Sequence, residues 1–414
     1  MLIEARVQKV SAWEVLDSRA TPAVAVGALL SDGSAALAKV PGGASPSRHE
    51  ACDLRDGDPT RFGGKGVLRA IDNVNRIIGP AIRDMNAGDQ AAIDRRMIEL
   101  DGTPDKSRLG TNAILGVSCA VARAAATSAR QALWQFLAGK RRASLPLPLV
   151  HIISRWQQAA WSFDFADFLI VPHGAPGFEA AIAMAVGVHS AARTVLEGHG
   201  YTLTGVTSLG AWGPHLEREE RALDILMESI IRAGYTPGTQ ISIAVDASAS
   251  TFQRLDYGVE FLSRLVEQYP IVSIEDGLGA DDWDGWARLT AALGNKVQLI
   301  GDDLFATNPA RLEEGIARGA GNAVLVKMNQ IGTLTETFAV IDRARQAGYR
   351  VVIAARAGET EDDFLADLAV ASGAGQIKVG SVQGSERMAK YNRLLWIEQH
   401  FGLPWETAIT PLPR

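Results

Sequence analysis

The spacing of apolar residues along the chain changes near residue 140. In the segments "VSAWEVLDS" (10–18) and "PAVAVGALLSDGSAALAKV" (22–40), apolar and polar residues alternate with a period near two around an "SDGS" turn, which predicts a meander of strands. From about residue 64, as in "GKGVLRAIDNVNRIIGPAI", apolar residues recur at helical spacing. We therefore expect an α+β domain over residues 1–140, in which helices pack on a small sheet.

Short runs rich in valine and isoleucine repeat beyond the polar, proline-containing stretch "GKRRASLPLPLV" (139–150). Each interval between them holds an amphipathic helix pattern, and one strand, one helix and two loops take about 25 to 30 residues. Repeated units of this kind close into a parallel barrel, which we expect over residues 141–414. The runs end on polar residues 29, 27, 25 and 29 positions apart, namely Asp246, Glu275, Asp302, Lys327 and Arg356, and a sixth run, "GQIKVGS", carries Lys378.

The acids at the ends of these runs predict a metal site. In such a barrel the carboxyl-terminal strand ends face the active-site mouth, so Asp246, Glu275 and Asp302 would converge there. Three carboxylates repel one another unless a cation lies between them, and oxygen ligands favour Mg²⁺ or Mn²⁺ over zinc. The alternative is that each acid caps a helix or forms a salt bridge in a loop.

Two lysines, Lys327 and Lys378, follow the acids in the same strand-end pattern. A lysine near a divalent cation is expected to have a lowered pKa, so it can act as a base near neutral pH. Together with a metal, such a base favours removal of a proton next to a carboxylate, because cations stabilise the charge that develops. Alternatively, the lysines pair with Asp303 or Asp276.

Composition and charge narrow the classes of partner. The 414 residues are 47% hydrophobic, enough for a large core, and a formal net charge of -6 gives no basic field for nucleic acid. The start of the chain has no apolar leader, and no run of about 18 apolar residues appears, so we expect a cytoplasmic protein with no membrane segment. Cys52 and Cys119 lack the spacing of a disulfide framework or a zinc site.

Motifs along nearly the whole chain resemble the enolase family. They follow the family order and include "VLDSRATPAVAV", "PGGASPSRHEACDLRDGD", "GDDLFATN", "VKMNQIGTLTET" and "AGETEDDFLADLAVASGAGQIKVGS". The resemblance implies the α/β enolase fold, with an N-terminal α+β capping domain and a C-terminal modified (β/α)8 barrel. It also implies two Mg²⁺ ions per subunit and a homodimer or higher homo-oligomer.

The resemblance assigns roles to most of the residues named above. Asp246, Glu275 and Asp302 fall on the ligands of the first metal ion, and Ser45 falls on the serine that ligates the second. Lys327 falls on the base that takes the C2 proton of 2-phosphoglycerate, Lys378 on the lysine that holds the substrate carboxylate, and Arg356 on an arginine that binds the phosphate.

Other positions depart from the family pattern. In "TSLGAWGPH", Leu209 stands where enolases carry the acid that helps the hydroxide leave. Ala355 replaces a histidine and Ala357 a serine in "AARAGETED", while Asp167 stands where a glutamate is expected and Gln158 where an active-site histidine is expected. Asp167 could partly replace the missing acid. Further departures are Ala166 in place of a glutamine, and Pro46 and Ser47 in place of a threonine and a glycine.

These departures concern the hydroxyl and phosphate ends of the substrate, so they favour a changed substrate. We expect a lyase that abstracts the proton next to a carboxylate and eliminates water from a phosphorylated or phosphonylated carboxylic acid related to 2-phosphoglycerate; the phosphonate rests on family analogy. The alternatives are the ordinary enolase reaction, a catalytically impaired paralogue with a binding role, and epimerisation that uses both lysines.

Overall fold

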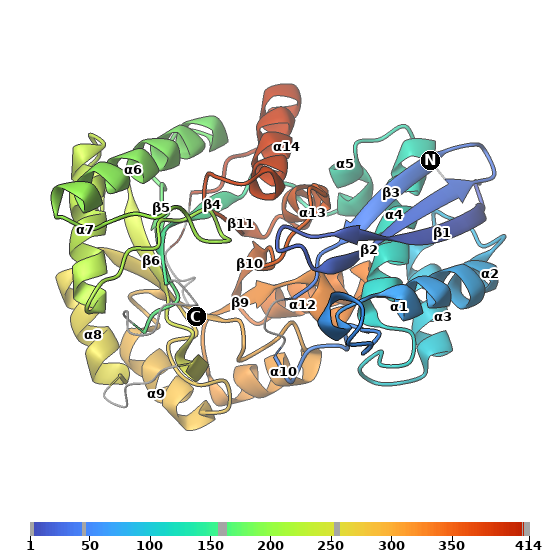
Figure 1. Cartoon of the computed structure of the whole chain (residues 1–414), viewed down its shortest axis with the longest axis horizontal. Coiled ribbons are helices and arrows are strands. Elements are labelled where there is room, and N and C mark those ends of the chain that lie inside the picture. Colours follow the sequence, from blue (N-terminus) through green and yellow to red (C-terminus); the bar gives the residue numbers. More distant parts are fainter. Residues whose placement is uncertain (1–3, 44–46, 156–163, 252–256, 408, 410–414) are drawn as a thin grey trace. The chain divides into compact units, whose positions relative to one another are not determined.

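A computed structural model describes residues 4–43, 47–155, 164–251, 257–407 and 409 of the chain (Figure 1). Contacts between Cα atoms divide it into two compact units. The first comprises residues 1–143, 326–342 and 355–373, and the second comprises residues 144–325, 343–354 and 374–414. The predicted boundary between residues 140 and 141 stays a prediction.

The first unit contains a three-stranded antiparallel sheet in the order β1 (Val7–Leu16), β2 (Pro22–Leu30), β3 (Ala35–Val40). Helix α4 (Thr111–Ser128) packs on β2 and β3 (Figure 1). The helix approaches closely because Gly116 faces the sheet, where an added Cβ would lie 2.5 Å from a methyl group of Val26. The predicted meander covered by helices is therefore confirmed.

The other helices of the first unit are mostly short. The run predicted from about residue 64 begins as a helix only at Leu68, and it contains a wide π turn between two α-helical segments. Helix α13 packs against α5 within the same unit. The elements are η1 (Phe62–Gly64), α1 (Leu68–Asn73), η2 (Val74–Ile78), α2 (Gly79–Ile82), α3 (Gln90–Asp101), α5 (Leu133–Ala138), α11 (Met328–Ile331), α12 (Leu334–Gln346, whose last four residues belong to the second unit) and α13 (Phe364–Ser372).

The second unit is built on a closed eight-stranded barrel. Strand β5 runs antiparallel to both of its neighbours, β4 and β6, whereas the pairs from β6 to β9 and from β10 through β11 to β4 are parallel. The strands are β4 (Leu147–Ser154), β5 (Asp167–Val171), β6 (Ser242–Asp246), β7 (Ile271–Glu275), β8 (Gln298–Gly301), β9 (Ala323–Val326), β10 (Arg350–Ala354) and β11 (Gly375–Gly380). The predicted α/β class with a barrel is confirmed, and one strand of the barrel is reversed.

Helices between the strands surround the barrel (Figure 1). Their ends follow from local sequence: the Asn308 side chain accepts hydrogen bonds from the backbone at the start of α10, Pro309 occupies its first turn, and Gly319 ends it in the left-handed conformation. The helices are α6 (Phe178–Gly198), α7 (Glu219–Arg232), η3 (Ala249–Thr251), α8 (Val259–Gln268), α9 (Trp283–Leu293), α10 (Pro309–Arg318) and α14 (Ser385–Phe401).

The barrel core is apolar. Side chains from β4, β5, β6, β8, β9 and β10 form one buried cluster, among them Leu149, Leu169, Ile300, Leu325 and Val352. The barrel is thus a filled core rather than a pore, so polar side chains at its strand ends stand out from an apolar background. Among the described residues, no helix combines the length and the apolar character that crossing a membrane requires.

Candidate functional site

Three acids lie side by side at one edge of the barrel. The strand register pairs Asp167 with Asp246 and Asp246 with Glu275, so the acids form a row across β5, β6 and β7. Asp246 and Glu275 are the last residues of their strands, whereas Asp167 is the first residue of β5. Because β5 runs antiparallel to β4 and β6, its first residue lies at the edge of the barrel where those two strands end.

Lys378 bridges two of these acids from β11. Its Nζ lies 2.8 Å from Oδ2 of Asp246 and 2.7 Å from Oε2 of Glu275, and all three side chains are at least nine-tenths buried. Burial disfavours the charged amine, but the charges of Asp246 and Glu275 outweigh it and hold the pKa of Lys378 well above its usual range. These two carboxylates act against the lowered pKa expected beside a divalent cation, and Lys378 pairs with them rather than with Asp303 or Asp276.

A second group of acids lies beyond β7 and β8. The carboxylate of Asp276 accepts hydrogen bonds from the backbone N–H groups of Asp302 and Asp303, at 3.0 and 2.9 Å. One carboxylate oxygen from each of these three residues lies within 4.8 Å of the others. Of the predicted metal ligands, Asp302 therefore lies in this group, together with Asp276, to which the sequence argument gave no role as a ligand.

Among the described residues placed above at this edge, the acids outnumber the one lysine. Burial and then the charge of Asp246 raise the pKa of Glu275 well above its usual range, with Asp302 and Asp276 adding to the effect and Lys378 opposing it. Burial and then the charges of Asp302 and Asp303 do the same to the pKa of Asp276. A cation would stabilise the ionised forms of Glu275 and Asp276, and hard oxygen donors suit Mg²⁺. The residues present therefore fit a magnesium site.

Asp167 is held on both of its carboxylate oxygens. The hydroxyl of Ser154 donates a short hydrogen bond to Oδ1, and Nε2 of His151 lies 3.5 Å from Oδ2. Burial raises the pKa of Asp167, but His151 and then Lys378 and the Ser154 hydrogen bond outweigh it, so the pKa is lowered. An ionised Asp167 accepts a proton more readily than it donates one, so its partial replacement of the missing acid stays a prediction.

The segment that carries Leu209 is a turn packed on the barrel. The N–H of Gly210 bonds to the carbonyl of Thr207, and the N–H of Ser381 bonds to the carbonyl of Leu209. Trp212 lies in the core next to this turn: it is buried, it stacks on the ring of His189, and its indole N–H donates to the His189 carbonyl. The predicted site residues Gln158 and Ser45 lie outside the described residues.

Arg356 belongs to the first unit and is 6% exposed there. Its Nη1 lies 2.9 Å from Oε2 of Glu50, and its backbone N–H donates to Glu359. Gly43 lies close to this guanidinium, because an added Cβ there would lie 2.0 Å from Nη2 of Arg356 and would displace it. The arginine predicted to bind phosphate is thus fixed by Glu50, whose part the sequence argument missed.

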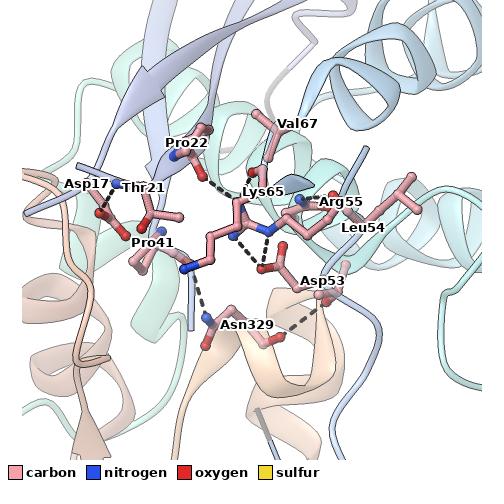
Figure 2. Close-up of polar contacts among 12 residues, drawn as sticks. Asp17, Thr21, Pro22, Pro41, Asp53, Leu54, Arg55, Lys65, Val67 and Asn329 are labelled. Atoms are coloured by element: carbon pink, nitrogen blue, oxygen red, sulfur yellow. Dashed lines mark hydrogen bonds and ion pairs between the residues drawn. The ribbon is translucent and has the colours of Figure 1, made fainter. Parts of the chain in front are cut away.

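Lys327 caps the start of α11, directly after β9. Within the first unit this short helix is tied to distant segments. The side-chain amide of Asn329 donates to the carbonyl of Pro41 at 3.2 Å (Figure 2). In addition, the N–H of Ala51 bonds to the carbonyl of Gln330. The backbone that follows Lys327 is therefore held in place by hydrogen bonds to Pro41 and Ala51.

A cavity of about 420 Å³ lies in the same unit, lined among others by Asp17, Arg19, Gly42 and Lys65. Figure 2 shows that one wall is braced by Arg55, which bonds the carboxylate of Asp53 and the carbonyls of Pro22 and Lys65. The guanidinium of Arg55 is thus used internally rather than offered to a ligand.

Comparisons with known proteins agree along nearly the whole chain. The family model described as "Enolase, N-terminal domain" matches residues 7–137, and the one described as "Enolase, C-terminal TIM barrel domain" matches residues 142–259 and 255–407. The chain is 48% identical over 409 residues to the protein named "Enolase" in Mycobacterium leprae, which covers 96% of this chain and 95% of the relative. It is also 48% identical over 415 residues to "Enolase 1" of Methylococcus capsulatus, with 97% and 98% covered.

Proposed function

The chain belongs to the enolase family and is a carbon–oxygen lyase of the enolase type, and we propose that it dehydrates 2-phosphoglycerate with Mg²⁺. The observation that carries this proposal is the charged Lys378 between Asp246 and Glu275 in a buried site with excess carboxylate. Such a site offers both a fixed cation and anionic oxygens to a substrate that develops charge on its carboxylate.

Magnesium would be held by Asp246, Glu275 and Asp302, with Ser45 as a ligand of a second ion. When bound, Mg²⁺ would supply positive charge that stabilises the charge developing on the substrate carboxylate. The raised pKa of Glu275 supports this assignment, because a carboxylate that resists ionisation without a further cation is expected where a cation belongs.

The other proposed roles, proton removal and substrate binding, fall to side chains of this chain. We assign Lys327 to removal of the proton next to the carboxylate and Lys378, as a permanent cation, to holding the carboxylate. Arg356, with Gln158 and Ser45, would bind the rest of the substrate, since a planar guanidinium suits a phosphate.

An altered substrate remains a second candidate because of Leu209 and Ala355. Neither side chain can donate a proton to a leaving hydroxide, and the loss of one such acid typically costs about 10² to 10⁴ in rate. Against this, relatives named enolase share 48% of the sequence over nearly full length, which favours the ordinary reaction over a phosphonate substrate. A protein kept only for binding is the third candidate.

The test incubates the protein with 2-phosphoglycerate and Mg²⁺ and measures two reactions. Formation of phosphoenolpyruvate reports the whole reaction, and exchange of the C2 proton in deuterated water reports the base alone. Dehydration at the rate of a parallel enolase supports the proposal. Exchange with slow dehydration that Leu209→Glu accelerates favours the altered substrate, and the absence of both despite Mg²⁺ binding favours a binding role. Lys327→Met should abolish exchange.

We further propose a homodimer or larger homo-oligomer and a cytoplasmic location. The oligomer is tested by light scattering of the full chain, with a monomer mass as the contrary result.

A further inference from the structure

The row of acids includes one, Asp167, whose surroundings differ from those of its neighbours. Asp246 and Glu275 share Lys378, but the hydrogen bonds of Asp167 go to Ser154 on Oδ1, with His151 beside Oδ2. His151 and Ser154 are both on β4 and are 3% and 2% exposed. Two groups from one strand thus hold opposite oxygens of one buried carboxylate.

A β-bulge makes this arrangement possible. Residues three apart in a regular strand point to opposite faces, so His151 and Ser154 could not both reach Asp167. The pairing with β5 shifts between His151 and Ile153, which leaves Ile152 as an extra residue and brings the two side chains to the same face. The carbonyl of Ile152 bonds to the N–H of Trp212, so the bulge is held from the segment that carries Leu209.

The side chain of His151 lowers the stability of the fold through one of its two ring nitrogens. Its Nδ1 is buried and has no hydrogen-bond partner in the part of the chain that the structure describes. A buried polar atom without a partner costs about 1–3 kcal/mol. A histidine kept despite such a cost points to a need for its other nitrogen, the one beside Asp167.

We propose that His151 and Ser154 are positioning residues that fix the Asp167 carboxylate for the leaving-group half of the reaction. Lys378 shows why such positioning is needed: its charge attracts Asp167, yet its Nζ donates hydrogen bonds to Asp246 and Glu275. Held by His151 and Ser154, Asp167 does not turn toward the amine and compete for it. This inference rests on the proposed function for its reaction, although not for its geometry.

The kinetic test uses variants that keep or remove the donor. His151→Gln retains an amide N–H near the position of Nε2, and His151→Leu removes it. A misplacement of about 1 Å can cost about 10²-fold in rate, so we expect kcat of His151→Leu to fall by about that factor, with KM and C2-proton exchange near the parent values and partial rescue in His151→Gln. Ser154→Ala should act in the same direction. His173→Gln is the matched control, because this histidine bonds Ser242 instead.

An NMR experiment tests the contact between His151 and Asp167 without measuring enzyme activity. In protein labelled with ¹⁵N only in histidine, Asp167→Asn should shift the ring signals of His151 and leave those of His173 in place. If the His151 signals do not move, or if His151→Leu and His151→Gln lose the same activity, the inference is overturned. If the parent protein neither exchanges nor dehydrates 2-phosphoglycerate while the His151 signals respond, the proposed function fails and the positioning contact stands.

Discussion

Replacing Lys378 by methionine tests the charge balance on which the candidate site depends. The change removes one ammonium and keeps an unbranched side chain of similar length. Asp246 and Glu275 then face each other without the group that lies 2.8 and 2.7 Å from their oxygens. The neighbouring charges of Asp302 and Asp276 already disfavour ionisation of Glu275.

The expected cost is large because the three groups are buried. Removing one partner of a buried ion pair typically costs about 3–5 kcal/mol, since the other charge is left uncompensated. The cost should depend on pH. The pKa of Glu275 lies above its ordinary value of 4.5 and rises further without Lys378, so the acid becomes neutral, and the penalty falls, as the pH drops toward that ordinary value.

The measurement is urea unfolding of metal-free protein at about pH 8 and pH 5.5, in the parent and in Lys378→Met. We expect the loss of unfolding free energy to be clearly smaller at the lower pH. The double variant Lys378→Met with Glu275→Gln should recover part of the loss at pH 8, because it removes one of the uncompensated charges. A loss below about 1 kcal/mol, the value of an exposed pair, or an equal loss at both pH values would refute this view of the site.

Three smaller changes test other parts of the structure. Gly43→Ala should cost about 1–3 kcal/mol in urea unfolding and raise KM, because its Cβ would collide with Arg356, whereas Gly198→Ala, with no atom within 4 Å of the new Cβ, should not. Ala20→Gly should raise the unfolding free energy by about 0.5–1 kcal/mol, because Ala20 has a φ of 55° that favours glycine; an unchanged urea midpoint would contradict this. Addition of Mg²⁺ should raise the thermal midpoint more at about pH 8 than at about pH 5.5, because Glu275 must be ionised to bind it, and equal shifts at both pH values would argue against Glu275 as a ligand.

The acids at the strand ends could be predicted from the sequence because a barrel repeats the same strand-and-helix unit. The spacing of Asp246, Glu275 and Asp302 follows from one strand and one helix per unit, and the first two do end their strands. Asp167 could not be found in this way. It begins β5, and nothing in the apolar run "DFLIV" tells a reversed strand from a parallel one, so only the resemblance to enolases pointed to it.

Partners far apart in the sequence were missed for a different reason. Glu50 lies 306 residues from Arg356, and no local pattern connects them. His151 lies in an apolar run where a histidine suggests only a core residue, and the bulge that re-aims it depends on pairing with β5. The sequence argument for a lowered pKa of Lys378 considered only a metal ion and missed the two carboxylates across the barrel, whose charges outweigh burial and raise that pKa.

The adjacent acids in "IVSIEDG" have separate tasks, which explains why a buried strand ends on like charges. Glu275 is the last residue of β7 and faces Lys378. Asp276 then turns away with a φ of 43°, and its carboxylate accepts the backbone N–H groups of Asp302 and Asp303. Since Asp302 follows β8 rather than ending it, the strand alone does not fix its position. Asp276 fixes it instead, so the second acid of the pair places the backbone of the third proposed metal ligand.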